Sequence, residues 1–349
     1  MSKPATAVDP KTTFTPQSLT ESMQKYRTEL MTMPMFAMQA ALAHMAIRTG
    51  IRYKEHVHDM SGDFEIGPYD KYKMGKGELA IKQRTLETFF GNCIEPIDVN
   101  SLYQTLWGSD ISKGEQLKTV DWVKRVCAYI FAQLGEKLFM EMWTAVRNDN
   151  GKKTHDLFNG FLAIENVEIN AGTMSQENQN FYPLPTGGIT PENAEDIIND
   201  FIWGVGNWKG VHKKLRDARG MKLFMSDRSK HYYEVSYQTN HGALPYNQQF
   251  TKAHLDGKPN IEFVALANVP DDYLLLTGRN NILSLWNQKG SDETFLVEKS
   301  LTSHYDVDFI ANLFYGEQYL SVNKEMLAVM KAQPTAPAAA AADTDESGD

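Results

Sequence analysis

The sequence predicts an α+β fold built around one long β-hairpin and one long helix. Three observations support this prediction. Apolar residues alternate on both sides of a Gly-rich stretch within residues 51–95, which is typical of a hairpin. An apolar stripe of helical period runs through residues 112–147, and short apolar runs crowd the C-terminal third. We therefore expect a mixed sheet with few helices after the long helix.

Composition narrows the class of protein. The 349 residues are 42% hydrophobic and 23% charged, which is enough chain for a large buried core. No window approaches the ~18 consecutive apolar residues of a membrane helix, and the first residues lack the apolar core of a secretory signal. Two cysteines cannot form a disulfide framework, so we expect a reducing cytoplasm. The formal net charge of -9 disfavours tight binding of nucleic acid.

The sequence predicts different structures for the two ends of the chain. Two apolar stripes of helical period flank Pro34 and predict two helices, the second of which ends near Gly50. From Lys331 onward the composition shifts to Pro, Ala and acidic residues, which cannot bury enough apolar surface to offset the entropy of ordering. We expect residues 331–349 to be a disordered acidic tail.

The predicted hairpin at residues 51–95 has segregated charges. Its outgoing arm carries the acidic residues Glu55, Asp59, Asp63, Glu65 and Asp70, and its return arm carries the basic residues Lys71, Lys73, Lys76, Lys82 and Arg84. Facing opposite charges attract by about 0.2–1 kcal/mol per pair. The hairpin can be a solvated ribbon, but an isolated two-stranded ribbon is only marginally stable in water. We therefore expect it to lie on a neighbouring subunit, with these charged residues as candidates for the inter-subunit contact.

Local patterns predict the elements after the hairpin. In the long helix, apolar residues recur every three or four positions from Val123 to Met142. Thr190 and Pro191 predict the start of a second helix, and Ser226 is a typical N-cap for a third. Strands are expected at residues 161–164, 221–225, 261–266, 273–276, 282–286, 294–298 and 309–320, and a last helix at residues 323–330.

A search for chemistry finds one weak candidate, a metal site at His56, His58 and Asp59. Imidazoles two positions apart in a strand project from one face and could share a metal ion. Nothing else in the sequence completes the ligand set, so an exposed polar strand is favoured over a metal site. The sequence also has no complete phosphate-binding loop, dinucleotide motif or nucleophile elbow. We predict no catalytic residue and no cofactor.

Three stretches of the sequence, together with the order of the elements, resemble a known family. The stretches are TLETFFGNCIEP at residues 85–96, DLFNGF at residues 156–161 and HGALPYN at residues 241–247. They are similar to capsid proteins of phages and prophages of Bacteroides-type hosts. A loose arm, a long hairpin, one long helix, an α/β unit and returning strands resemble the major capsid protein of tailed bacteriophages, which has the Hong Kong 97 type fold.

This resemblance implies a division of the chain. The parts are an N-terminal arm at 1–50, an extended E-loop hairpin at 51–95, a P-domain at 96–154 with its spine helix at about 112–147, an A-domain at 155–280, returning strands at 281–330 and the acidic tail at 331–349.

The same resemblance implies a structural protein rather than an enzyme. Such a protein self-assembles into hexamers and pentamers of an icosahedral head, encloses double-stranded DNA without binding it specifically, and meets portal and scaffolding proteins. Its expected place is the virion capsid, assembled in the cytoplasm of the bacterial host and away from any membrane. Two alternatives stay open: an encapsulin-like compartment of the same fold, and a metal-dependent hydrolase that uses His56, His58 and Asp59.

Overall fold

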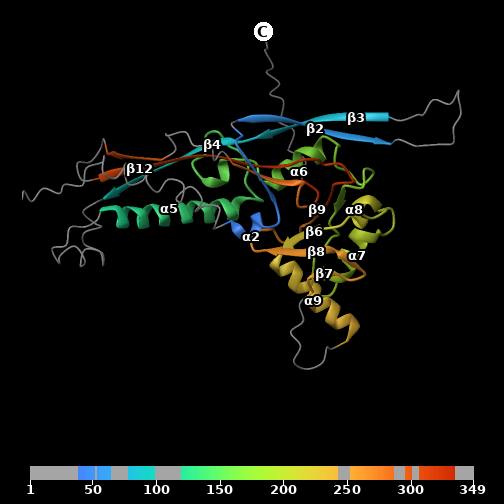
Figure 1. Cartoon of the computed structure of the whole chain (residues 1–349). Coiled ribbons are helices and arrows are strands. Elements are labelled where there is room, and N and C mark those ends of the chain that lie inside the picture. Colours follow the sequence, from blue (N-terminus) through green and yellow to red (C-terminus); the bar gives the residue numbers. More distant parts are fainter. Residues whose placement is uncertain are drawn as a thin grey trace, which may run out of the picture. The chain divides into compact units, whose positions relative to one another are not determined.

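The computed structural model describes most of the chain as two compact units. The described residues are 38–51, 53–63, 78–98, 119–242, 252–286, 295–300 and 306–334. The first unit comprises Met1–Ala37, Phe90–Glu136 and Gln288–Leu313, and the second comprises Met38–Phe89, Lys137–Asn287 and Phe314–Asp349. Figure 1 labels the elements. Across the described residues, no helix combines the length and apolar character needed to span a bilayer.

A six-stranded mixed sheet forms the centre of the second unit. Its strands, in spatial order, are β5 (Phe181–Pro183), β13 (Leu327–Lys331), β9 (Leu274–Gly278), β6 (Met221–Ser226), β8 (Lys258–Leu266) and β7 (His254–Leu255). β6 pairs with β8 in parallel and with β9 in antiparallel. All five residues of β13 are buried, as are the first four of β9. Strands covered on both faces read as continuous apolar runs, which explains why the sequence predicts most of this sheet.

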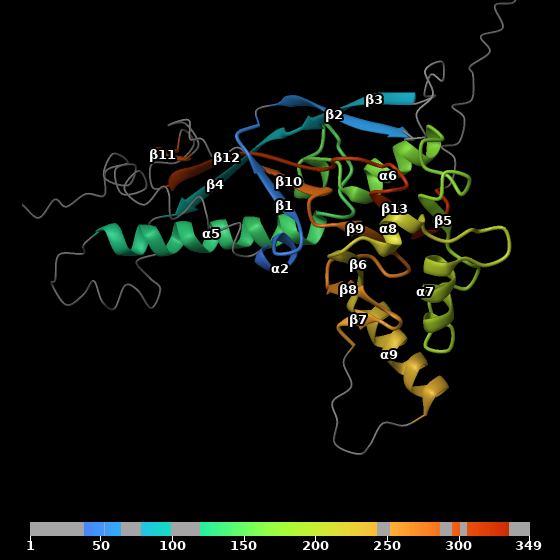
Figure 2. The same ribbon diagram turned by 45° about the vertical axis from the view of Figure 1, so that its right-hand side comes forward.

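Helices cover this sheet and complete its core. They are α6 (Phe161–Asn170), α7 (Ala194–Trp203), α8 (Lys213–Asp217) and α9 (Asp227–His241), with a 3-10 turn at Thr154–Asp156. α7 packs against α9, and α9 contacts β6 and β8 (Figure 2). The buried core runs from Ile197 and Phe201 of α7 to Leu223 of β6. Ser226 caps α9 as predicted, because its hydroxyl oxygen accepts a hydrogen bond from the N–H of Ser229.

A second set of strands is built around β12 (Asp306–Tyr319). In the second unit, β10 (Ile282–Trp286) pairs with residues 315–319 of β12 in antiparallel and with β1 (Ala46–Thr49) in parallel. In the first unit, β11 (Phe295–Lys299) pairs with residues 307–311 of β12. β4 (Phe89–Asp98) also pairs with β12. The predicted strand at residues 282–286 is therefore confirmed, and those near 294–298 and 309–320 are shifted by a few residues.

The long helix is present as α5 (Thr119–Glu141), but it ends six residues before the predicted limit. The chain from residue 142 to 148 bonds instead to a later segment: Val146 N–H donates to His155 O at 3.0 Å and Gly160 N–H donates to Ala145 O at 2.9 Å. Gly160 allows this approach, since a β-carbon there would lie 2.7 Å from the carbonyl oxygen of Met142. Residues 112–118 of the predicted helix lie outside the described residues.

Three other expectations are wrong. Residues 161–164 begin helix α6 rather than a strand, because a four-residue apolar run does not distinguish the two. Residues 327–330 belong to strand β13, which is held between β5 and β9, and do not continue a helix from residue 323. Near the N-terminus the second predicted helix is limited to α2 (Gln39–Leu42), and Ala46–Thr49 are β1. Residues 1–37, including the first predicted helix, lie outside the described residues.

Candidate functional site

The predicted hairpin consists of β2 (Lys54–Asp63) and β3 (Glu78–Glu87), which pair in antiparallel from Lys54 with Glu87 to Asp63 with Glu78. Residues 89–95, expected on its return arm, belong to β4 instead. Alternate residues along each strand point to opposite faces. One face carries Met60 and, directly across from it, Ile81, whose side chains are 68% and 56% exposed. This pair leaves apolar surface exposed to water. Burial of that surface against another molecule would be favourable, because transfer of apolar groups out of water lowers the free energy.

The base of the hairpin is fixed to the second unit by a small apolar cluster. Leu86 of β3 is fully buried against Ile51, Leu283 and Leu285. Beside this cluster, Thr88 N–H donates to the carbonyl oxygen of Tyr53 at 2.8 Å. The proximal end of the hairpin is therefore part of the core, whereas its Met60 and Ile81 end is exposed.

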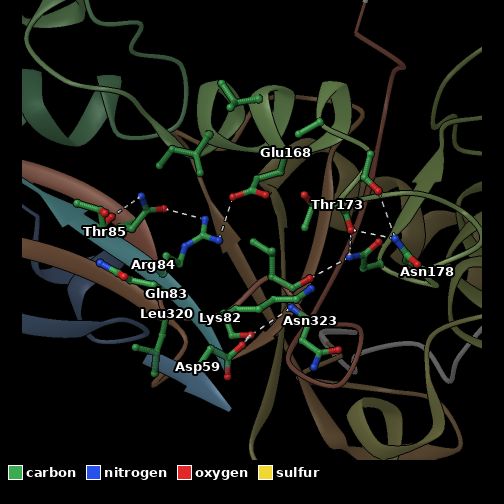
Figure 3. A pocket seen from close by; sticks show the side chains of 18 of the residues that line it. Asp59, Lys82, Gln83, Arg84, Thr85, Glu168, Thr173, Asn178, Leu320 and Asn323 are labelled. Carbon is green, nitrogen blue, oxygen red and sulfur yellow. Dashed lines mark hydrogen bonds and ion pairs between the residues drawn. The ribbon is translucent and has the colours of Figure 1, made fainter. Parts of the chain in front are cut away.

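A cleft of about 1010 Å³ opens beside the hairpin base (Figure 3). Its walls come from β3, from α6 and the loop that follows it, and from the segment after β12. The charged lining residues are Asp59, Lys82, Arg84, Glu168 and Lys324. The carboxamide lining residues are Gln83, Asn159, Asn178, Asn180, Gln318 and Asn323.

Three polar contacts, two from Arg84 and one from Asp59, bridge the cleft and set the direction of the hairpin. Arg84 reaches from β3 to Glu168 of α6, with Nη1 2.9 Å from Oε1, and its Nη2 donates to Gln318 Oε1 at 3.1 Å (Figure 3). Asp59 of β2 accepts a hydrogen bond from the Ser321 hydroxyl. The side chains of Arg84 and Glu168 are only 14% and 21% exposed, so solvent screens this ion pair less than a surface pair.

The lining of the cleft combines carboxamide and apolar side chains. Several of these carboxamides already bond within the chain: Asn178 and Asn180 both donate to the carbonyl oxygen of Thr173, and Gln318 accepts from Arg84. Apolar side chains such as Ile164 and Val167 also line the cleft, and Val167 is 68% exposed. Within the described part of the chain, no three His, Cys, Asp or Glu side chains gather closely enough to hold a metal ion.

The candidate metal ligands do not converge. His56 and His58 lie on the exposed face of β2, whereas Asp59 points from the opposite face into the cleft. His56 Nδ1 lies 3.1 Å from the hydroxyl oxygen of Thr85, its neighbour across the strand.

The charged residues of the hairpin are divided between contacts within the chain and positions outside the described residues. Arg48 contacts Glu55 at 2.7 Å and Lys54 contacts Glu87 at 3.0 Å. Lys82 stands directly across from Asp59 in the register, so the predicted facing of opposite charges occurs at this pair. Asp63 ends β2. Glu65, Asp70, Lys71, Lys73 and Lys76 lie outside the described residues. An inter-subunit role for these residues remains a prediction.

Sequence reasoning missed a buried polar cluster that fixes α6. Lys331 was expected to begin the tail, but it ends β13, is 5% exposed, and its Nζ lies 2.9 Å from Oε2 of the fully buried Glu165. Tyr273 and Tyr319 donate hydrogen bonds to Glu165 Oε1 at 2.5 Å and 2.7 Å. Burial and the adjacent carboxylate raise the pKa of both phenols well above the usual value, so both keep their protons.

Glu165 and Glu168 are neighbours one helical turn apart, and through them α6 is tied both to β13 of the sheet and to β3 of the hairpin. The sequence signal for this role is weak: Glu165 directly follows the four apolar residues 161–164. Its partner Lys331 follows it by 166 positions, and no local pattern reveals such a pairing.

Comparison with known proteins shows which fold this is. No family model matches the chain, and a search of curated proteins finds no match. Solved structures do match. The capsid of an empty GTA particle aligns with a TM-score of 0.52 at 11% identity, over 95% of this chain and 96% of that one. The satellite phage P4 procapsid gives a TM-score of 0.51 at 13% identity, over 87% and 98%. The capsid of Myoviridae phage XM1 gives 0.50 at 12% identity, over 84% and 92%. The chain therefore has the Hong Kong 97 type fold that its sequence predicts.

Proposed function

We propose that this chain is the major capsid protein of a tailed bacteriophage. In this proposal, copies of the chain assemble into hexamers and pentamers of an icosahedral head that encloses double-stranded DNA. The observation that carries the proposal is the hairpin, whose base is buried in its own subunit while Met60 and Ile81 are exposed on its outer half. The fold shared with capsid subunits supports the same assignment.

The hairpin acts by reaching an adjacent copy. Contacts of this kind are heterologous, because a protruding element of one copy meets a different surface of the next, and such contacts close into rings. Burial of Met60 and Ile81 supplies the apolar part of the contact. The charged residues toward the hairpin tip, Lys71, Lys73 and Lys76 among them, supply electrostatic selectivity against acidic groups of the neighbour.

In this proposal, each region of the chain corresponds to a part of a capsid subunit. Residues 51–95 act as the E-loop, except for residues 89–95, which belong to β4; residues 96–154 act as the P-domain and 155–280 as the A-domain. The net charge of -9 suits a container that encloses DNA without gripping it. Portal and scaffolding proteins are the proposed partners, assembly takes place in the cytoplasm of the bacterial host, and the nearest relatives are proposed among phages of Bacteroides-type hosts.

Electron microscopy of the purified, overexpressed protein tests the assembly. We expect closed shells or rings of five and six subunits, together with fast-sedimenting material in the ultracentrifuge. A monodisperse, compact monomer at high protein concentration would contradict the proposal.

The contents of the shells distinguish the phage head from an encapsulin-like compartment. Particles recovered from infected or induced cells should contain nuclease-protected double-stranded DNA. A co-purifying enzyme inside a shell free of DNA would instead identify the compartment.

A further inference from the structure

The surface around α8 is strongly basic although the chain as a whole is acidic. Residues 207–222 contain six basic residues and one acidic residue: Lys209, Lys213, Lys214, Arg216, Arg219 and Lys222, with Asp217. Lys258 of β8 joins this surface by contacting Asp217 at 2.6 Å. Glu325, just before β13, contacts Lys214 at 2.8 Å. We call the region formed by Lys209, Lys213, Lys214, Arg216, Lys258 and Lys324 the α8 surface.

The positive charges of the α8 surface exceed the acidic groups among them. The pKa of Asp217 is lowered, first by its hydrogen bond from Lys258 and further by the charges of Arg216 and Lys213. The pKa of His212 is lowered by burial and then by the charges of Lys324 and Lys214. Five cations therefore surround two carboxylates, those of Asp217 and Glu325. The cations are Lys213, Lys214, Arg216, Lys258 and Lys324.

An exposed tryptophan, Trp203, lies among the cations of the α8 surface. Trp203 is 48% exposed, with the Arg216 guanidinium 4.5 Å and the Lys258 ammonium 5.1 Å from its ring centre. Cations over an aromatic face are held by its quadrupole, so these charges are fixed in place. Trp and Arg are also the residue types most enriched at energetically important contacts.

The loop that follows Trp203 is rigid. Val205 and Trp208 exchange two backbone hydrogen bonds at 3.0 Å and 2.9 Å, and Trp208 Nε1 donates to the carbonyl oxygen of Phe201 at 3.0 Å. Gly204 and Gly210 have positive φ, and a β-carbon at Gly204 would lie 2.5 Å from Trp208 O. The basic surface is therefore preorganised, which lowers the entropy lost when a ligand binds.

We propose that the α8 surface binds the acidic C-terminal segment of the same chain, residues 343–349. This segment carries Asp343, Asp345, Glu346 and Asp349 and no basic residue, so its charge complements the α8 surface.

The length of the chain permits this contact. Glu325 already touches the α8 surface, and the nine residues from there to Pro334 span at most ~31 Å. Nine further residues lead from Pro334 to Asp343 and can span the same ~31 Å in return. Tethering gives the segment a millimolar effective concentration, which offsets the weakness of each exposed charge pair.

Zero-length carbodiimide cross-linking of the full chain tests this contact, because the reagent joins a carboxylate to a lysine amine only where they touch. We use an equal mixture of isotopically heavy and light protein and identify the joined peptides by mass spectrometry. The expected products link residues 343–349 to Lys209, Lys213, Lys214, Lys258 or Lys324 within one copy. Their yield should fall roughly fivefold in Lys213→Glu/Lys214→Glu and at 0.5 M salt.

A matched control is Lys152→Glu/Lys153→Glu, which reverses two exposed lysines outside the α8 surface and should leave the yield unchanged. Equal melting temperatures of the two double variants would show that both are folded. A second variant, Asp343→Asn/Asp345→Asn/Glu346→Gln, should lose the cross-links without touching the folded unit.

Three results would overturn the proposal. One is equal cross-linking of the segment to Lys152 or Lys153, and another is linkage between heavy and light copies alone. The third result comes from a binding test with a labelled 20-nucleotide single strand. If the tail occupies the α8 surface, this nucleic acid should bind better after removal of residues 335–349. Equal binding with the segment present would show that the α8 surface is open to nucleic acid and not occupied by the tail.

Discussion

At the scale of single residues, Glu165 and Glu317 are both buried but in opposite surroundings. Glu165 faces the cation of Lys331, whereas Glu317 is contacted by the neutral hydroxyl groups of Tyr315 and Ser284. Burial raises the pKa of Glu317 well above its usual value of 4.5. The two glutamates therefore respond differently to substitution and to pH.

Replacing Glu165 by Gln should destabilise the protein by about 3–5 kcal/mol, because it leaves the Lys331 ammonium buried and unpaired. Chemical denaturation of the purified subunit measures this change in the free energy of unfolding. The double variant Glu165→Gln/Lys331→Met, which removes both charges, should recover a large part of the loss. A single variant as stable as the wild type would show that the ion pair does not fix α6.

Glu317 predicts a pH dependence of stability. The folded state keeps a proton that the unfolded chain releases above about pH 4.5, so the free energy of unfolding should fall as pH rises from there toward the raised pKa. Glu317→Gln mimics the neutral acid and should remove this part of the slope while stabilising the protein at neutral pH. Parallel slopes for the variant and the wild type between pH 5 and 8 would contradict this interpretation.

At the scale of elements, the Arg84 contact between β3 and α6 should hold the hairpin in the direction needed for assembly. Arg84→Ala removes contacts to Glu168 and Gln318 and should cost about 1–3 kcal/mol, with a larger loss of assembled particles. Arg48→Ala is the matched control, since its pair with Glu55 is about 40% exposed and should contribute less than about 1 kcal/mol. Equal effects of the two variants on assembly would argue against a special role for Arg84.

The exposed apolar pair of the hairpin should drive assembly without stabilising the isolated subunit. Met60→Ser/Ile81→Ser should reduce the yield of shells by at least tenfold at equal melting temperature, because these side chains are already exposed in the subunit. Light scattering during assembly provides the measurement. Val146→Ser replaces another half-exposed apolar residue, outside the hairpin, and should assemble normally. Normal assembly by the hairpin variant would show that Met60 and Ile81 do not drive assembly.

The sequence predicts those elements whose pattern is set locally. Strand β10 and the cap of α9 by Ser226 are correct because continuous apolar burial and an N-cap leave direct signals. Helix α6 and strand β13 are misassigned because tertiary contacts decide them: Glu165 is tolerated in the core only through Lys331. The cleft could not be predicted, since Arg84 and Glu168 come together from distant parts of the sequence.

At the scale of the whole molecule, the second unit has its own sheet, helices and buried core. This unit can therefore fold on its own, and in the proposed assembly new contacts would be added to a structure that already exists. The hairpin is the exception, because two strands alone bury too little apolar surface to be stable in water. We propose that this hairpin completes its packing on an adjacent copy.

Photo-cross-linking from position 60 tests this contact between copies. Met60 is replaced by a photoreactive phenylalanine analogue, heavy and light chains are mixed before assembly, and the linked peptides are identified by mass spectrometry. We expect linkage between heavy and light copies in assembled particles. Linkage confined to single copies, with the hairpin on its own subunit, would contradict it.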